Sequence, residues 1–65
     1  MNLEDARGLV GSDLLWLVPG TGKMLVGVTV RDTRVAYGRT QVLIEPLSGR
    51  GSRWADAELL QPVED

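Results

Sequence analysis

The residue types that most often perform catalysis or hold metals are scarce in this chain of 65 residues. It contains no Cys and no His, which removes thiol nucleophiles, imidazole bases and the common zinc ligands. Asp56 and Glu58 lie two residues apart, but the sequence around them does not indicate the cleft that a catalytic carboxylate pair needs. Helix capping and solubility explain both residues. We therefore predict a non-catalytic protein that uses no metal and no cofactor.

One segment, Gly20-Thr21-Gly22-Lys23, has the composition of a phosphate-binding loop. The complete motif requires Gly at position 17 and Ser or Thr after the Lys, whereas this chain has Leu17 and Met24. Without that hydroxyl group there is no magnesium ligand. The segment is therefore predicted to be a turn between two strands.

Arginine supplies the best candidates for binding residues. Arg39 and Arg50 lie at predicted loop tips, and Arg34 projects from the outward face of a predicted strand. Such guanidinium groups can contact phosphates, pair with an acidic protein surface or form an ordinary solvated surface. The sequence leaves these three alternatives open for Arg31, Arg34, Arg39, Arg50 and Arg53.

The two tryptophans have different predicted roles. Tryptophan is enriched at interfaces because it buries a large area, but a chain without Phe also needs its large side chains in the core. We place Trp16 in the core and leave Trp54, which borders a glycine-rich loop, between core residue and binding anchor. Leu25 and Leu43 are predicted to be exposed apolar residues. The predicted partner-binding residues are Arg34, Arg39, Leu43, Arg50, Arg53 and Trp54.

Charge is unevenly distributed along the chain, whose formal net charge is −2. Residues 23–53 contain six basic and two acidic residues, whereas residues 1–22 contain three acidic and one basic, and residues 54–65 contain four acidic residues and no basic ones. A basic middle can steer an acidic partner toward the protein. The acidic first residues do not fit a secretion signal, and the longest apolar run, 14–18, is too short for a membrane span. We predict a cytoplasmic location.

The first twelve residues predict a short helical lead-in. Asn2 is a favourable helix cap, and Glu4 and Asp5 suit the positive end of the helix dipole. The apolar residues Leu3, Ala6 and Val10 would share one face, with Gly11 ending the helix.

Short strands are predicted from residue 13 onward. Residues 14–18 form an apolar strand, and Met24, Val26, Val28 and Val30 alternate with outward positions in the next strand. A short strand at 53–55 follows the glycine-rich loop 48–52, a single helical turn occupies 57–59 after Asp56, and residues 60–62 form the last strand.

A hairpin is predicted at Gly38-Arg39, as a two-residue type II′ loop. This turn pairs Val35 with Val42 and places Val35, Tyr37, Val42 and Ile44 on one inward face. The inward residues of the preceding segment are even-numbered, whereas Val35 and Tyr37 are odd-numbered. The sequence therefore predicts a phase shift between Arg31 and Arg34, as a β-bulge in one long bent strand.

Together these elements resemble SH3-like small barrels, a group that includes Tudor-like and KOW-like domains and many short phage or plasmid proteins. The resemblance lies in residues 25–28, 36–39 and 42–46, and in Trp54 followed by Leu59-Leu60. It implies a mainly β, five-stranded SH3-like barrel with a short N-terminal helix and a single helical turn before the last strand. The whole chain is predicted as one domain: helical lead-in 1–12, barrel 13–62 and frayed tail 63–65.

Three functions are compatible with these features. The first hypothesis is a non-catalytic protein-binding module, an adaptor or inhibitor, for example from a mobile genetic element. The second is a small barrel that binds DNA or RNA through its arginine-bearing loops. The third is a subunit of a homo-oligomer whose site forms across the interface. We favour the first, because the overall charge is acidic and exposed apolar residues flanked by arginines suit a protein surface. No membrane partner is predicted.

Overall fold

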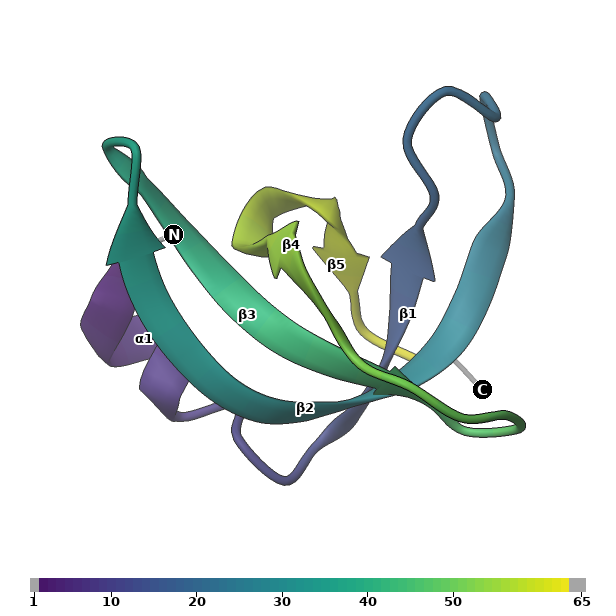
Figure 1. Cartoon of the computed structure of the whole chain (residues 1–65), viewed down its shortest axis with the longest axis horizontal. Coiled ribbons are helices and arrows are strands. Elements are labelled where there is room, and N and C mark those ends of the chain that lie inside the picture. The colour runs from purple at the N-terminus through teal and green to yellow at the C-terminus, as the bar shows by residue number, and fades with distance from the viewer. Residues whose placement is uncertain (1, 64–65) are drawn as a thin grey trace.

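The computed structural model describes residues 2–63 and is mainly β, as predicted. Five antiparallel strands form one sheet in the order β4-β3-β2-β1-β5, with one short helix and a 3-10 turn (Figure 1). The elements are α1 (Leu3–Arg7), β1 (Asp13–Leu17), β2 (Leu25–Ala36), β3 (Arg39–Pro46), β4 (Arg53–Asp56), η1 (Ala57–Leu59) and β5 (Leu60–Gln61). Two residues of the predicted tail, 64 and 65, lie outside the described residues.

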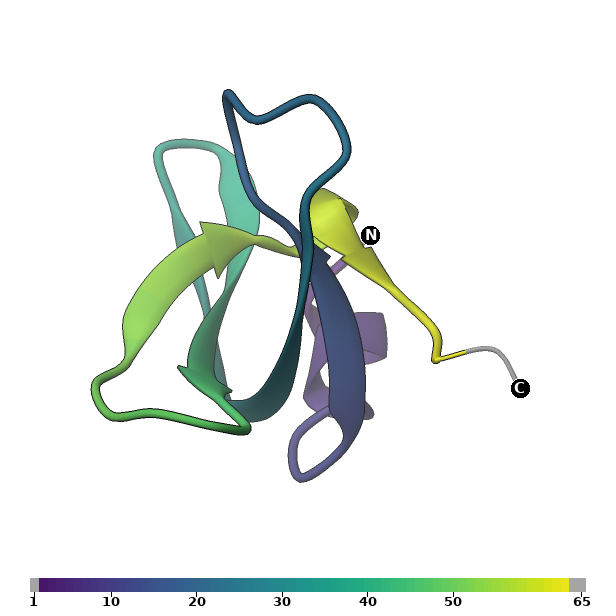
Figure 2. The same cartoon turned by 90° about the vertical axis from the view of Figure 1, so that its right-hand side faces the viewer.

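A single apolar core occupies the concave side of the sheet. Period-2 alternation turns one set of side chains from each strand toward this core, and the helix and the 3-10 turn each add an alanine to it. Figures 1 and 2 show β2 and β3 as a long bent ribbon curling around this side. The buried residues are Ala6, Trp16, Val28, Val30, Val42, Ile44, Ala55 and Ala57. The predicted core position of Trp16, which is 7 % exposed, is confirmed.

The predicted phase shift in the long strand is confirmed. Val30 pairs with Ile44, but the next pair is Asp32 with Leu43, so Arg31 is an extra residue in β2. This β-bulge moves the inward positions from even to odd numbers and bends the strand. Thr33 consequently lies opposite Val42, on the same face as Val30.

The predicted hairpin is present, but the predicted turn residues, Gly38-Arg39, and the predicted pairing register were wrong. Ala36 pairs with Arg39, so the two central residues are Tyr37 and Gly38, with φ angles of 55° and 71°. Two positive φ values define a type I′ turn, whose twist suits long twisted strands. Val35 therefore pairs with Thr40 rather than Val42. The hairpin end extends past the core, leaving Val35 59 % and Tyr37 92 % exposed, so neither is the core residue that we expected.

Replacing Tyr37 with asparagine should stabilise the protein by about 0.5–1 kcal/mol, because asparagine adopts the left-handed conformation at less cost than a bulky residue. The 92 % exposed tyrosine ring buries little area that could be lost. Urea denaturation measures the change. Tyr37→Ala is the control, since alanine keeps the Cβ strain and should bring no gain; equal stabilisation by both variants would contradict the turn assignment.

The N-terminal helix is shorter than predicted. Asn2 caps it, with its Oδ1 accepting a hydrogen bond of 2.8 Å from the Asp5 N–H, and Ala6 is fully buried against the sheet. The helix ends at Arg7 with Gly8 as its C-cap, before the predicted stop at Gly11. Val10 therefore does not continue the apolar face and is 47 % exposed.

The strand boundaries are close to those predicted, with one change at the start of β2. Strand β2 begins at Leu25, so Met24 lies in the preceding loop and is 56 % exposed instead of inward. The segment 20–23 lies in the loop between β1 and β2, as predicted. The single helical turn before the last strand is confirmed as η1.

The two ends of the sheet are edge strands. Among the described residues β4 pairs only with β3, and β5 pairs only with β1, so no hydrogen-bonded ladder closes the sheet. Within residues 2–63, no helix is both long enough and apolar enough to cross a membrane.

Candidate binding surface

The convex face of β2, β3 and β4 gathers most of the predicted binding residues. Residues paired across antiparallel strands share a face, so the ladders place them in rows. One row contains Asp32, Leu43 and Trp54, and the next contains Arg34, Gln41 and Asp56. Leu43 and Trp54 are half-buried, which answers the open question about Trp54: it is an outer-face residue and not part of the core.

Arg34 and Trp54 form the centre of this face. The guanidinium carbon of Arg34 lies 4.2 Å from the centroid of the Trp54 ring, a cation–π contact. The Nε–H of Arg34 donates a hydrogen bond of 2.8 Å to Oε1 of Gln41. These two contacts hold the guanidinium plane in place, while its terminal N–H groups make no hydrogen bond to any described residue. A partner's oxygen atoms could bind to them without displacing the stack.

Arg39 is held by Asp56. Its Nη1 donates to Oδ2 of Asp56 at 3.1 Å, joining the start of β3 to the end of β4. Asp56 precedes η1 but makes no side-chain capping bond, so its carboxylate serves the ion pair instead of the cap that the sequence predicted.

A double-mutant cycle with Arg39→Gln and Asp56→Asn should give a small coupling energy, about 0.2–1 kcal/mol, since the side chains are 70 % and 31 % exposed. The coupling should fall in 1 M salt, because the Debye length there is only about 3 Å. Urea denaturation of the four proteins measures it. A coupling indistinguishable from zero at low salt would contradict a fixed Arg39–Asp56 pair.

A groove runs along β4, between this face and the β1–β2 side of the molecule. We call it the aromatic groove; it has a volume of about 430 Å³, and its lining includes Trp16, Tyr37, Trp54, Arg39, Arg53 and Leu59. The three aromatic residues of the chain thus lie around one depression, together with two arginines. Tyr37 reaches it because the hairpin turn carries the ring beyond the core.

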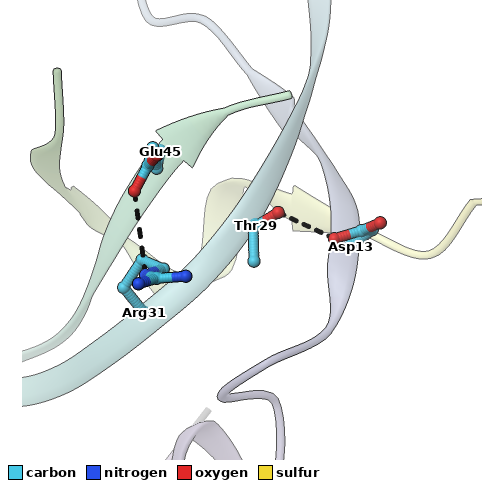
Figure 3. A network of polar contacts seen from close by, with 4 residues as sticks. All are labelled: Asp13, Thr29, Arg31 and Glu45. Atoms are coloured by element: carbon cyan, nitrogen blue, oxygen red, sulfur yellow. Dashed lines mark hydrogen bonds and ion pairs between the residues drawn. The ribbon is translucent and has the colours of Figure 1, made fainter. Parts of the chain in front are cut away.

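Arg31 belongs to a separate polar network on the same sheet (Figure 3). Its Nε lies 3.7 Å from Oε2 of Glu45, and Thr29 donates a hydrogen bond of 2.7 Å to Oδ1 of Asp13. Because Glu45 offsets its charge, Arg31 is a weaker candidate for contacting an anionic partner than Arg34.

The structure separates the remaining two predicted arginines from Arg34. Arg53 pairs with Ile44 and therefore points to the concave side, where its guanidinium carbon lies 5.1 Å from the centroid of the Trp16 ring. Arg50 lies in the β3–β4 loop and lines a different pocket, next to Arg53.

The predicted set is thus split. Arg34, Arg39, Leu43 and Trp54 share one face, Arg53 lies at the boundary between two depressions, and Arg50 lies apart. Sequence reasoning missed Tyr37 and Asp56 as members of the surface, and it did not select Gln41, which shares the outward face with Arg34, as a binding residue. Only Tyr37 carried a usable signal, because an aromatic residue directly before Gly38 can occupy the first central position of a type I′ turn.

Comparison with known proteins gave no match to a family model, a curated protein or a solved structure. Among residues 2–63, no cluster of three or more potential metal-ligating side chains occurs.

Proposed function

We propose that this chain is a non-catalytic protein-binding module, and that it binds an extended acidic segment of its partner along the aromatic groove. The observation that carries the proposal is the position of three aromatic rings and two arginines beside the unpaired edge of β4. Such a module would act in the cytoplasm as an adaptor or an inhibitor.

The edge of β4 favours an extended partner. On the side away from β3, no described strand pairs with the backbone of β4. An added peptide strand would gain main-chain hydrogen bonds there, and its alternate side chains would lie in the groove. Aromatic side chains provide a large contact area at low entropic cost, as binding anchors do.

The charge of the surface favours an acidic segment. Arg34 stacks on Trp54, a residue that lines the groove, and keeps terminal N–H groups available, while Arg53 itself lines the groove. Asp56 is occupied by Arg39. A partner carrying carboxylates would therefore meet guanidinium groups whose positions are already restricted by stacking on Trp54 and Trp16.

We also propose that the fold is an SH3-like small barrel whose seam between β4 and β5 is open. The strand order β4-β3-β2-β1-β5, the bulged and bent β2, and the 3-10 turn before β5 support this assignment. A curved sheet with a single core on its concave side is the same architecture with an open seam.

A nucleic-acid function has one observation in its favour. Aromatic rings interleaved with arginines are typical of surfaces that stack and hold single strands, and the fold supplies the aromatic residues that the sequence did not place among the arginines. The formal net charge of −2, with four acidic residues in 54–65, opposes it, because phosphate attraction dominates such binding.

Amide chemical-shift mapping distinguishes these functions. The first probe is an end-capped peptide of about ten residues in which Glu and Val alternate, long enough for one strand. The others are the same peptide with Lys in place of Glu, and a thymidine oligonucleotide of about ten nucleotides. We expect the Glu–Val peptide to shift the signals of Tyr37, Trp54 and Ala55, and the Lys–Val peptide to leave them unchanged.

Other outcomes overturn the proposal. Salt-sensitive binding of the oligonucleotide at the same residues, without peptide binding, would establish the nucleic-acid function instead. Equal binding of both peptides would remove the role of the arginines. Sedimentation velocity addresses the homo-oligomer hypothesis, which a strict monomer at high concentration eliminates.

A further inference from the structure

A second depression lies at the start of β4, on the concave side of the sheet. We call it the arginine-rimmed pocket; Trp16, Val26, Val28 and Ile44 line its inner part, and Arg50 and Arg53 line its outer part. Val28 and Ile44 are each 1 % exposed, so the pocket reaches the buried core. It shares Trp16 and Arg53 with the aromatic groove, but it lacks Tyr37 and Trp54.

The size of the pocket suits a single ring. Its volume is about 190 Å³. An apolar cavity of about 150 Å³ in another protein is known to hold benzene. The arginine-rimmed pocket can therefore take a phenyl group, with a short chain leading outward.

The charge at the rim is of one sign. Arg50 and Arg53 are both exposed, and the described residues that line the pocket include no acidic side chain. The guanidinium of Arg53 is held over the Trp16 ring at 5.1 Å, so it is partly ordered before any ligand binds. An anionic group at the mouth would gain charge-assisted hydrogen bonds, whereas a cation would be repelled.

Trp16 forms part of the inner wall. Its indole Nε1 is the one buried side-chain polar atom among the described residues that has no hydrogen-bond partner. The Trp16 indole N–H signal, compared with that of Trp54, which lines only the aromatic groove, reports on this pocket.

From these features we infer that the arginine-rimmed pocket binds small carboxylates with an aromatic or similarly sized apolar body. The ring occupies the space between Val26, Val28 and Ile44, and the carboxylate lies at the mouth beside Arg50 and Arg53. This inference does not rest on the peptide binding proposed for the aromatic groove, although the two sites share Trp16 and Arg53.

Titration of the ¹⁵N-labelled protein with phenylacetate tests the inference. We expect the indole signal of Trp16 and the amide signals of Val28 and Ile44 to shift with a dissociation constant of about 1 mM, typical of so small a ligand. The indole signal of Trp54 should stay in place. Phenethylamine, with the same ring and the opposite charge, and acetate, without the ring, should produce no comparable shift.

Two variants test whether the carboxylate of phenylacetate lies at the mouth of the pocket. Arg50→Gln should weaken phenylacetate binding about tenfold, because it removes a charged hydrogen-bond donor from the mouth. Arg7→Gln removes an exposed arginine from α1, outside the pocket, and should leave binding unchanged. No shift at about 20 mM phenylacetate, well above the expected constant, would overturn the inference. Equal binding of phenethylamine, or shifts confined to the Trp54 side, would do the same.

Discussion

Replacing Ile44 with alanine should lower the free energy of unfolding by about 2–5 kcal/mol, the range measured for this type of substitution in other protein cores. Ile44 is 1 % exposed and pairs with Val30, next to the bulge, and with Arg53 in β4. The missing atoms would leave a cavity where β2, β3 and β4 meet. A domain of 65 residues is expected to have only a few kcal/mol of stability, so a large part of the population should unfold.

Urea denaturation followed by tryptophan fluorescence measures this effect, because Trp16 reports on the same core. Val35→Ala is the matched control: it removes a branched side chain from the same inward face of the β2–β3 ladder, at a position 59 % exposed. Its effect should stay within about 0.5 kcal/mol. A similar loss for both variants would show that the hairpin end is packed, contrary to the register described above.

Replacing Trp54 with alanine should weaken binding of the Glu–Val peptide about 30-fold, equivalent to about 2 kcal/mol, as for anchor residues at other interfaces. The substitution removes one wall of the aromatic groove and also frees Arg34, whose guanidinium stacks on the ring at 4.2 Å. The loss of the groove wall and the release of the Arg34 guanidinium should both weaken binding of the peptide. Titration of the variant with the peptide, monitored at Ala55, measures the loss.

Two further variants make this result specific to the groove. Trp54→Phe keeps a ring for Arg34 to stack on and should retain most of the affinity, since a phenyl face also attracts a cation. Leu25→Ala changes an outer-face apolar residue, 42 % exposed, at the far end of β2, and should leave the affinity unchanged. Unaltered affinity in a folded Trp54→Ala protein would overturn the proposed function.

Several features of the candidate site could be predicted because they depend on residue type alone. Arg34 and Leu43 were selected as outward residues of strands, Arg39 as a loop-tip residue and Trp54 as a core residue or binding anchor, and the structure places all four on one face. The grouping with Tyr37 and Asp56 could not be predicted, since these residues join the surface only through the ladders β2–β3 and β3–β4 and the twist of the hairpin.

The turn type and register of the hairpin could not be predicted from the local sequence. Gly38 can occupy the first central position of a type II′ turn or the second of a type I′ turn, and the two choices shift the pairing by two residues. Both keep the same side chains on the same face, so the alternation of apolar residues does not distinguish them. In the observed pairing Val30 lies opposite Ile44 and Thr33 opposite Val42, across the bulge at Arg31.

By itself, the sequence determined the class of fold, the helix cap at Asn2, the core position of Trp16 and the need for a phase shift in the long strand. These properties follow from composition, period-2 alternation and capping, which act over a few neighbouring residues. Only the tertiary structure decided the register of the hairpin, the exposure of Tyr37 and Val35, and which arginines face Trp16 or Trp54. Those outcomes depend on contacts between distant segments, whose free energies depend on how the strands bend around a common core.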